Sequence, residues 1–265
     1  MGQYVLLRRC QRAQSTAAQV VVTRQQEAHQ LLCEVFRCHA VDEAMRDSEH
    51  PCATIVRFQD RFEGPFQPPT PWVGQLDQAP ILFVGSNPNI GGDEFYPDTA
   101  WPDDDLVDFF DYAFSGENLQ IKDGVHARQA NGGYGPFVRT WAGVRGRAKE
   151  LLQRNPQPGL DYAMTEVVRC RSWTEIGVGE ARGHCADLYL ERTIALSPAR
   201  VIVALGSHVR GWLRHRWHLG PEPVAEVRFD RTTRLVAFLP HPTSHVPKTF
   251  QSVMPEELER LRAAL

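Results

Sequence analysis

The chain lacks a long apolar run, a secretory leader and a tight Cys-x-x-Cys pair. None of its 265 residues lies in a stretch near the roughly 20 apolar residues that cross a bilayer, so we expect no membrane partner. The segment Met1–Cys10 lacks the apolar core and the small-residue cleavage site of a secretory signal. We therefore expect a cytoplasmic protein, in which six cysteines are more often thiols or metal ligands than disulfides.

The chain also lacks an excess of basic charge, because its formal net charge is −3. The acidic residues are concentrated between Asp93 and Asp123, whereas the C-terminal half is rich in arginine: Arg200, Arg210, Arg214, Arg216, Arg228, Arg231 and Arg234. Binding to nucleic acid requires only a local basic face. The composition therefore weakens a nucleic-acid role without excluding one.

No internal repeat is present, and the chain divides by composition. Residues 13–44 carry apolar side chains at helical spacing, and the Pro- and Gly-rich stretch Gly64–Gly74 indicates an extended connector. We predict an N-terminal helical extension and connector over residues 1–74. Residues 75–265 form the predicted core, with an acidic insertion at about residues 90–130.

Short apolar runs in the second part of the chain predict buried strands. The four runs are Ile81–Val84, Tyr162–Val168, Val201–Leu205 and Leu235–Leu239. Continuous apolarity is typical of parallel strands that are covered on both faces, and helices fit at about residues 140–153, 181–196 and 207–217. The predicted fold is a three-layer α/β/α sandwich with a central, mostly parallel, four-stranded sheet. Ligands bind such sheets beyond the carboxyl ends of the strands.

Four sequence blocks fall at or near those ends. They are Gly85–Asn89 (Gly-Ser-Asn-Pro-Asn), Tyr134–Val138 (Tyr-Gly-Pro-Phe-Val), Met164–Cys170 (Met-Thr-Glu-Val-Val-Arg-Cys) and Leu239–His245 (Leu-Pro-His-Pro-Thr-Ser-His). Taken one at a time, these residues are typical of an ordinary loop, a core phenylalanine and a structural histidine. Together the blocks resemble the uracil-DNA glycosylase superfamily and are closest to its iron–sulfur (family 4) branch.

The resemblance implies a role for residues of the first two blocks. Asn87 would position the water that attacks C1′ of the sugar, and Phe137 would stack on the base after it leaves the duplex. Ser86 and Asn89 would contact the base. Asn89 stands where the uracil-specific branch has a tyrosine, and its smaller side chain would leave room for a substituent on base C5.

The last block resembles the superfamily motif His-Pro-Ser. A neutral His241 would donate a hydrogen bond to the base O2 and stabilise the charge of the departing base. The residues that follow would enter the minor groove and contact the DNA backbone: Thr243, Ser244, His245 and Lys248.

Cysteine spacing extends the resemblance. Cys170 and Cys185 are 15 positions apart, close to the spacing of one pair of cluster ligands in the family. Cys38 and Cys52 are the preferred second pair, chosen over Cys33. Four thiolates suit a [4Fe–4S] cluster or zinc, the cluster being implied by the resemblance, and buried free thiols remain an alternative. We expect Cys10 to be a free thiol.

Glu166 stands where the family has an asparagine that contacts the base edge. An ionised carboxylate only accepts hydrogen bonds, so it suits the N4 amino group of cytosine better than O4 of uracil. A buried, protonated glutamate would also pair with N3 of cytosine. The alternative is a salt bridge between Glu166 and an arginine such as Arg169.

These residues predict a monofunctional DNA glycosylase, because the resemblance places no lysine as a Schiff-base nucleophile. Removal of normal cytosine would be toxic, so we expect a modified cytosine such as 5-hydroxymethylcytosine or its glucosylated form. The bacterial anti-phage glycosylases of the superfamily act on such bases. The alternatives are a uracil or deaminated-base repair glycosylase and a non-catalytic DNA-binding protein. We expect a monomer whose partner is phage or damaged DNA.

Overall fold

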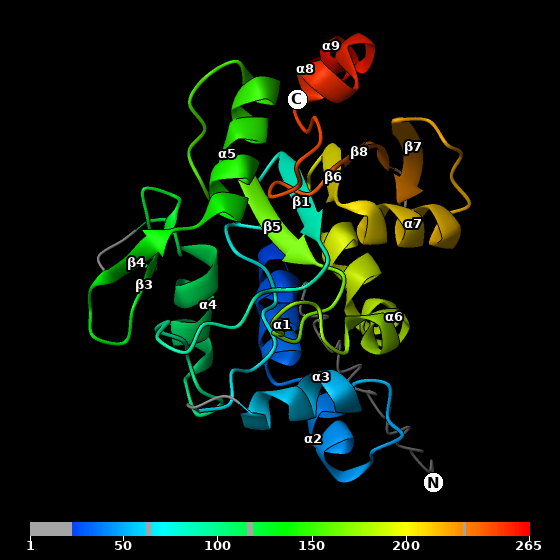
Figure 1. The fold of residues 1–265 in the computed structure, drawn as a ribbon. Coiled ribbons are helices and arrows are strands. Elements are labelled where there is room, and N and C mark those ends of the chain that lie inside the picture. The colour runs from blue at the N-terminus through cyan, green and yellow to red at the C-terminus, as the bar shows by residue number, and fades with distance from the viewer. Residues whose placement is uncertain (1–22, 62–64, 116–118, 230–231) are drawn as a thin grey trace, which may run out of the picture.

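The computed structural model describes residues 23–61, 65–115, 119–229 and 232–265, and its fold is α/β (Figure 1). The elements in chain order are α1 (Arg24–Phe36), α2 (His39–Arg46), α3 (Ala53–Phe58), the 3₁₀-helix η1 (Gln59–Arg61), β1 (Ile81–Gly85), α4 (Asp103–Asp111), β2 (Ile121–Lys122), β3 (His126–Arg128), β4 (Tyr134–Phe137), α5 (Arg139–Leu152), β5 (Tyr162–Glu166), α6 (Val178–Leu196), β6 (Val201–Leu205), α7 (Ser207–Arg216), β7 (Val224–Phe229), β8 (Thr232–Leu239), α8 (Phe250–Val253) and α9 (Pro255–Ala263).

The central sheet has the strand order β5-β1-β6-β8-β7. Strands β5, β1, β6 and β8 are parallel, as the four apolar runs predicted, and β7 pairs antiparallel with β8. The expected number of four strands was therefore wrong, because the described sheet has five. Buried and more exposed residues alternate along β7, as in an edge strand with one face toward solvent, so a search for continuous apolar runs misses it.

Successive side chains of the strands enter two different cores. Leu82 and Val84 of β1 pack in one core with α1, α6 and α7, whereas Ile81 and Phe83 pack in the other with α5, α8 and α9. This alternation follows from the two-residue period of a strand. Burial of each large apolar side chain stabilises the fold by about 1.5–3 kcal/mol. Helices therefore cover both faces of the sheet (Figure 1).

The N-terminal helices share a core with the sheet. Thr23 and Gln26 form a capping box that begins α1, and Leu31 and Phe36 of this helix are buried with residues of β1 and β6. The expected helical region began at residue 13. Its first ten positions, together with Cys10 and Gly64, lie outside the described residues.

The Pro-rich connector is extended, as expected, and its described residues follow the edge of the sheet. The backbone N–H of Val73 donates to the carbonyl of Met164 (2.8 Å), and the N–H of Met164 donates to the carbonyl of Val73 (2.9 Å). Thr70, Pro71 and Trp72 are buried. This segment is therefore a wall of the molecule next to β5, and not a loose linker.

The acidic insertion forms helix α4 and strands β2 and β3, which join β4 just after the insertion in a small antiparallel sheet with the order β2-β3-β4. Its strands contain two to four residues, too few for a periodic pattern to show in the sequence. The two ends of the insertion are hydrogen-bonded to each other. The N–H of Phe95 donates to the carbonyl of Arg128 (3.0 Å), and the N–H of Ala130 donates to the carbonyl of Asp93 (2.9 Å).

The other elements lie close to their predicted bounds. Strand β5 ends at Glu166, two residues before the predicted end, and β8 begins at Thr232, three residues before the predicted start. Helices α5, α6 and α7 match the three predicted core helices. In the described ranges, every helix is too short or too polar to cross a membrane.

Candidate functional site

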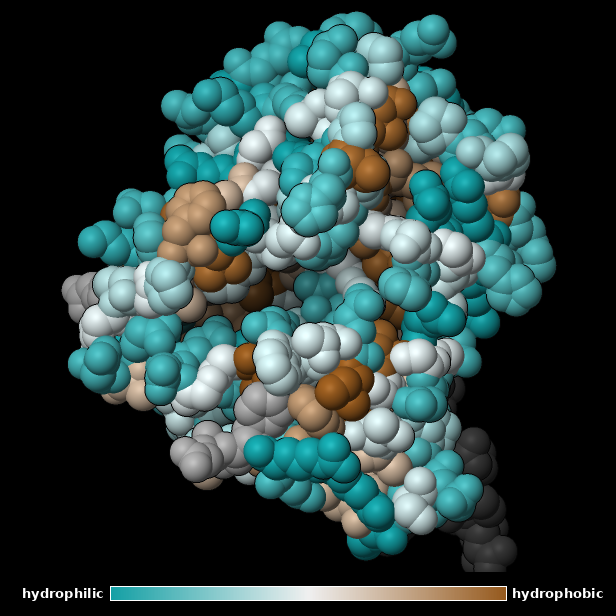
Figure 2. Space-filling view, in the orientation of Figure 1, coloured by the Kyte–Doolittle hydropathy of each residue, from teal (hydrophilic) through white to brown (hydrophobic). Residues whose placement is uncertain are grey.

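A cavity of about 590 Å³ opens at the carboxyl ends of the parallel strands. The loops after β1 and β8 contribute Asn87 and His241 to its lining, and the end of β5 contributes Glu166. Gly206 after β6 completes this side. In the space-filling view this face of the molecule is hollowed at its centre, with apolar side chains inside the hollow (Figure 2). Parallel strands bring these residues together although they are far apart in the sequence.

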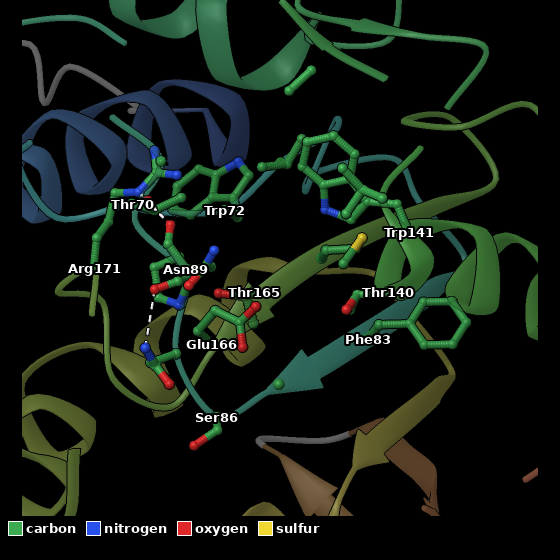
Figure 3. Close-up of a pocket in the computed structure, with 18 of the residues that line it drawn as sticks. Thr70, Trp72, Phe83, Ser86, Asn89, Thr140, Trp141, Thr165, Glu166 and Arg171 are labelled. Carbon is green, nitrogen blue, oxygen red and sulfur yellow. Dashed lines mark hydrogen bonds between the residues drawn. The ribbon is translucent and has the colours of Figure 1, made fainter. Parts of the chain in front are cut away.

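Glu166 is an acidic group on the core side of the cavity. It is the last residue of β5 and is paired in register with Gly85, the last residue of β1. Its Oε2 is enclosed and has no hydrogen-bond partner among the described residues, whereas Oε1 is not enclosed. Burial raises the pKa of Glu166 to about 8, and the charge of Arg169 opposes this effect. The carboxyl group is therefore mainly protonated at neutral pH. Figure 3 shows it between Asn89 and Arg171 on one side and Thr140 and Trp141 on the other.

No ion pair joins Glu166 to Arg169 in the part of the chain that the structure describes. The guanidinium group of Arg169 donates instead to the carbonyl of Pro71 and to Oγ1 of Thr193 (2.9 Å). Arg169 is fully buried and acts on Glu166 through its charge alone. The alternative expectation of a salt bridge is thus wrong for this arginine.

Asn87 presents one half of its amide to the cavity. Its Nδ2 donates to the carbonyl oxygens of Pro88 (3.0 Å) and Ser172 (3.3 Å). Both partners are acceptors, so the assignment of the amide nitrogen follows from the network. In the described residues Oδ1 has no hydrogen-bond donor, and it is available to accept a hydrogen bond from a water molecule.

His241 is held as a neutral donor. The backbone N–H of Thr243 donates to its Nδ1 (3.3 Å), and Oγ1 of Thr243 lies 2.8 Å from the same atom. Because Nδ1 accepts, the proton of the neutral ring is on Nε2. Burial lowers the pKa of His241, and Lys248 lowers it further while Glu175 opposes the shift. The imidazole is therefore uncharged at neutral pH.

Arg171 joins the insertion to the core and was missed in the sequence. Its Nε donates to the carbonyl of Asn89 (2.8 Å), and its Nη2 lies 2.5 Å from Oε2 of Glu94. The guanidinium carbon is 4.3 Å from the centroid of the Tyr96 ring. The side chain is only 7% exposed. The Arg-Cys-Arg sequence after β5 was the available signal, since a buried arginine requires a partner.

The aromatic lining differs from the expectation. Phe137 is 56% exposed and is not among the residues that line the cavity; its ring centroid lies 6.1 Å from that of His126. Trp141, in the first turn of α5, lines the cavity instead and is labelled in Figure 3. Ser86 and Asn89 line the cavity as expected.

The loop after β8 continues from the cavity to the surface. Thr243 lines the cavity, whereas Ser244, His245 and Lys248 do not. Nζ of Lys248 donates to the carbonyl of Ser244 (2.8 Å), which stabilises the turn. Val246, which the motif comparison overlooked, is 55% exposed at this surface.

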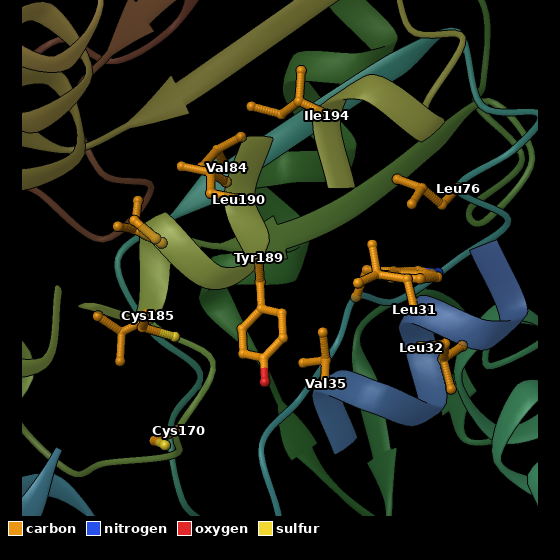
Figure 4. Close-up of a cluster of buried hydrophobic side chains, with 14 of the residues drawn as sticks. Leu31, Leu32, Val35, Leu76, Val84, Cys170, Cys185, Tyr189, Leu190 and Ile194 are labelled. Carbon is orange, nitrogen blue, oxygen red and sulfur yellow. The ribbon is translucent and has the colours of Figure 1, made fainter. Parts of the chain in front are cut away.

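The four cysteines chosen as ligands are all buried free thiols. Cys38 and Cys52 immediately precede α2 and α3, and Cys170 and Cys185 lie beside Tyr189 in the core (Figure 4). Burial raises the pKa of Cys170 well above the usual value, and the other three thiols raise it further. The four thiols are therefore neighbours. Among the described residues, no three His, Cys, Asp or Glu side chains are arranged to hold a single metal ion.

A four-iron cluster sets a different geometric requirement from a single ion, because each cysteine binds a different iron atom. The chemistry of the donor set fits such a cluster, since four thiols share one buried region. Cys33 does not belong to this group. The charged neighbours of Cys33 are Asp103 and Arg37.

Comparison with known proteins adds no name to this site: no family model matches the chain, and no curated protein matches it.

Proposed function

We propose that the protein is a monofunctional DNA glycosylase of the uracil-DNA glycosylase type that removes a modified cytosine and leaves an abasic site. The observation that carries this proposal is the presence of Asn87, Glu166 and His241 in one cavity. The five-stranded, mostly parallel sheet with helices on both faces is compatible with the three-layer fold that the motifs imply. A duplex base reaches such a cavity only by flipping out of the stack.

The reaction is hydrolysis of the bond between the base nitrogen and C1′. The bonding electron pair leaves with the base, the oxygen of a water molecule bonds to C1′, and one water proton is transferred to the base. Oδ1 of Asn87 accepts a hydrogen bond from this water and aligns it, but an amide does not remove the proton. Nε2–H of His241 stabilises the charge that develops on the departing base, an effect worth about 10²–10³ in rate.

Glu166 reads the edge of the base. As a neutral carboxyl group it has one donor and one or more acceptors, which pair with N3 and the N4 amino group of cytosine. Because Oε2 is enclosed, Oε1 is the atom that meets the base, and as a hydroxyl group it donates to N3 and accepts from the N4 amino group. The cavity of about 590 Å³ has the size that holds a drug-sized ligand, so it accommodates a cytosine with a large substituent.

The raised pKa of Glu166 also favours a second candidate function, a uracil or deaminated-base glycosylase. A pKa of about 8 keeps the carboxyl group protonated at neutral pH. A protonated carboxyl group pairs with N3–H and O4 of uracil as readily as with cytosine, because its proton moves between acceptor positions. Discrimination against uracil at neutral pH then depends on the rest of the cavity.

DNA binding is assigned to the loop after β8. Thr243, Ser244, His245 and Lys248 contact the backbone, and the exposed Val246 enters the base stack as an apolar wedge. Apolar wedges of this kind unstack base steps and kink the duplex. The acidic net charge of −3 predicts weak non-specific binding with a shallow dependence on salt, because few cationic groups neutralise phosphates.

Cys38, Cys52, Cys170 and Cys185 are proposed to hold a [4Fe–4S] cluster, with free thiols as the alternative, because the described side chains are not arranged around a single ion such as zinc. A bound cluster would cross-link the N-terminal helices to the loop after β5 and to α6, and so stabilise the fold. No step of the base excision depends on it. Cys185 lies next to Arg169, whose backbone N–H donates to its Sγ (3.2 Å).

Mass spectrometry of the bases released from DNAs that contain cytosine, uracil, 5-hydroxymethylcytosine or its glucosylated form tests the proposal. We expect release of a modified cytosine by the wild type and a loss of about 10²-fold or more in Asn87→Ala, with DNA binding retained. Asn155→Ala is the matched control, because Asn155 is exposed and outside the cavity.

Release of uracil alone would favour the repair enzyme. DNA binding without release of any base by the wild type would overturn the glycosylase proposal and favour a binding protein.

A further inference from the structure

The cavity has a second wall that the proposed reaction does not use. The insertion supplies this wall, and the lining residues relevant here are Glu94, Phe95, Tyr96, Phe109, Phe110 and Arg128. The reacting groups Asn87 and His241 belong to the core loops on the other side. When a pyrimidine contacts the core side of the cavity, the insertion side remains free to contact another part of the ligand.

The insertion wall is an apolar surface of interlocked rings. Phe109 packs against Phe95, Tyr96 and Phe110 with centroid distances of 6.1, 5.8 and 4.9 Å, and the pairs are tilted or edge to face. Such packing fixes the orientation of each ring. The wall is therefore preformed, which lowers the entropic cost of binding a ligand against it.

Arg128 is the cationic group of this wall. Its guanidinium carbon lies 4.8 Å from the centroid of Phe95, and its backbone is fixed because the carbonyl accepts from Phe95 and the N–H donates to Gln120 (2.8 Å). No carboxylate forms an ion pair with Arg128 in the described part of the chain. A planar guanidinium group stacked on a ring has several donors available for a ligand.

Glu94 adds an acceptor to the cavity lining that also contains Arg128. Its Oε2 is held by Arg171 at 2.5 Å, and the side chain remains 23% exposed in the cavity lining. The bond from Arg171 to the carbonyl of Asn89 ties Glu94 to the core loop after β1. The acceptor therefore keeps a set position between the two sides of the cavity.

We propose that Arg128 and Glu94 bind a neutral, hydroxyl-rich ring that is attached to C5 of the base, with the aromatic wall against its apolar face. A hydroxyl group donates and accepts, so a donor and an acceptor in the lining of one cavity match two of them. A hydroxyl group suits this wall because Glu94 supplies an acceptor that only a donating group can use. This inference rests on the proposed function and names the residues that select its substrate.

Arg128→Ala tests the inference in two measurements. We expect base release from glucosylated 5-hydroxymethylcytosine DNA to fall about 10- to 100-fold, since hydrogen bonds to a charged group are lost. Release from 5-hydroxymethylcytosine DNA should change less than about threefold. Lys122→Ala is the matched control, because Lys122 also lies over an aromatic ring of the small sheet, Tyr134 at 5.5 Å, but does not line the cavity.

The second measurement is binding of the free glucosylated nucleoside, followed by calorimetry. We expect the affinity to fall by a similar factor in Arg128→Ala and in Glu94→Gln, and to be retained in Lys122→Ala. An equal loss of release on both DNAs, or unchanged nucleoside affinity, would overturn the inference. If the wild type binds the nucleoside through Arg128 but releases no base, the proposed glycosylase function fails, whereas the proposed binding of the substituent by Arg128 and Glu94 is retained.

Discussion

The carboxyl group of Glu166 occupies the space that a side chain at position 85 would need. Gly85 and Glu166 are register partners at the ends of the adjacent strands β1 and β5. A Cβ atom on residue 85 would lie 2.0 Å from Oε2 and 2.8 Å from Cδ of Glu166. The absence of a side chain on Gly85 therefore allows the glutamate to lie over the end of β1 and to face the cavity.

Gly85→Ala is expected to displace Glu166 and lower base release about 10-fold, since two hydrogen bonds of a neutral carboxyl group are together worth about 1–3 kcal/mol. The free energy of unfolding should change by less than about 1 kcal/mol, because the displaced group is the end of a flexible side chain. Kinetics of base release and denaturant unfolding measure the two effects.

Gly146→Ala is the control for Gly85→Ala, since a Cβ at Gly146 meets nothing within 4 Å and alanine favours a helix by about 0.5–1 kcal/mol. In a Glu166→Ala background, Gly85→Ala should cause no further loss of release. An additive loss in the double variant would show that Gly85 acts independently of Glu166.

The stability of the protein should depend on pH through Glu166. Burial raises the pKa of Glu166 from 4.5 to about 8, so between these pH values the folded protein keeps a proton that the unfolded chain has lost. The wild type therefore loses stability as the pH rises from 4.5 to 8. Over this pH range we expect the free energy of unfolding of the wild type to fall by a few kcal/mol relative to that of Glu166→Gln. Urea unfolding at a series of pH values measures this difference.

Base release by the wild type should also decline above pH 8, where Glu166 ionises, and the decline should be absent in Glu166→Gln. If the free energies of unfolding of the two proteins changed in parallel from pH 4 to 9, that result would contradict the raised pKa of Glu166.

Trp141 is expected to be the aromatic residue that stacks on the extruded base. It lines the cavity, and a base–aromatic stack is worth about 1–3 kcal/mol, so Trp141→Ala should lower base release about 5- to 150-fold. Phe137→Ala is the matched control, because Phe137 is 56% exposed and outside the cavity lining. A larger loss in Phe137→Ala than in Trp141→Ala would reverse the assignment.

Cys170→Ser should abolish any bound iron–sulfur cluster and lower the stability of the protein, because one of four neighbouring ligands is removed. Iron and sulfide analysis, visible absorption and thermal unfolding of anaerobically purified protein measure the effect. Cys33→Ser is the control, since Cys33 is only half-buried and its charged neighbours are Asp103 and Arg37. Wild-type protein that contains neither iron nor zinc would show that the thiols are free.

The sequence was sufficient to predict the parallel core of the fold. The runs Ile81–Val84 and Val201–Leu205 are apolar at every position, which only strands with two covered faces require. Strand β7 was missed because an edge strand alternates, and β2, β3 and β4 because two to four residues carry no period.

For the site, the sequence was sufficient to place Asn87, Glu166 and His241 near the carboxyl ends of strands, since each follows an apolar run or lies near its end. It was not sufficient to place Phe137, whose side chain is directed by the pairing of β4 with β3 and not by its own sequence block. The clamp from Arg171 to Glu94 joins positions 77 residues apart, and no local pattern encodes it.

The amino-acid sequence by itself determined which strands are buried and which residues follow them, because burial on two faces demands apolar side chains at consecutive positions. Only the tertiary structure decided the protonation of Glu166, since its pKa depends on the enclosure of Oε2 above Gly85 and on the distance to Arg169. It also decided that the insertion forms a wall of the cavity, because contacts between distant segments are set by the packed fold and not by neighbours in the chain.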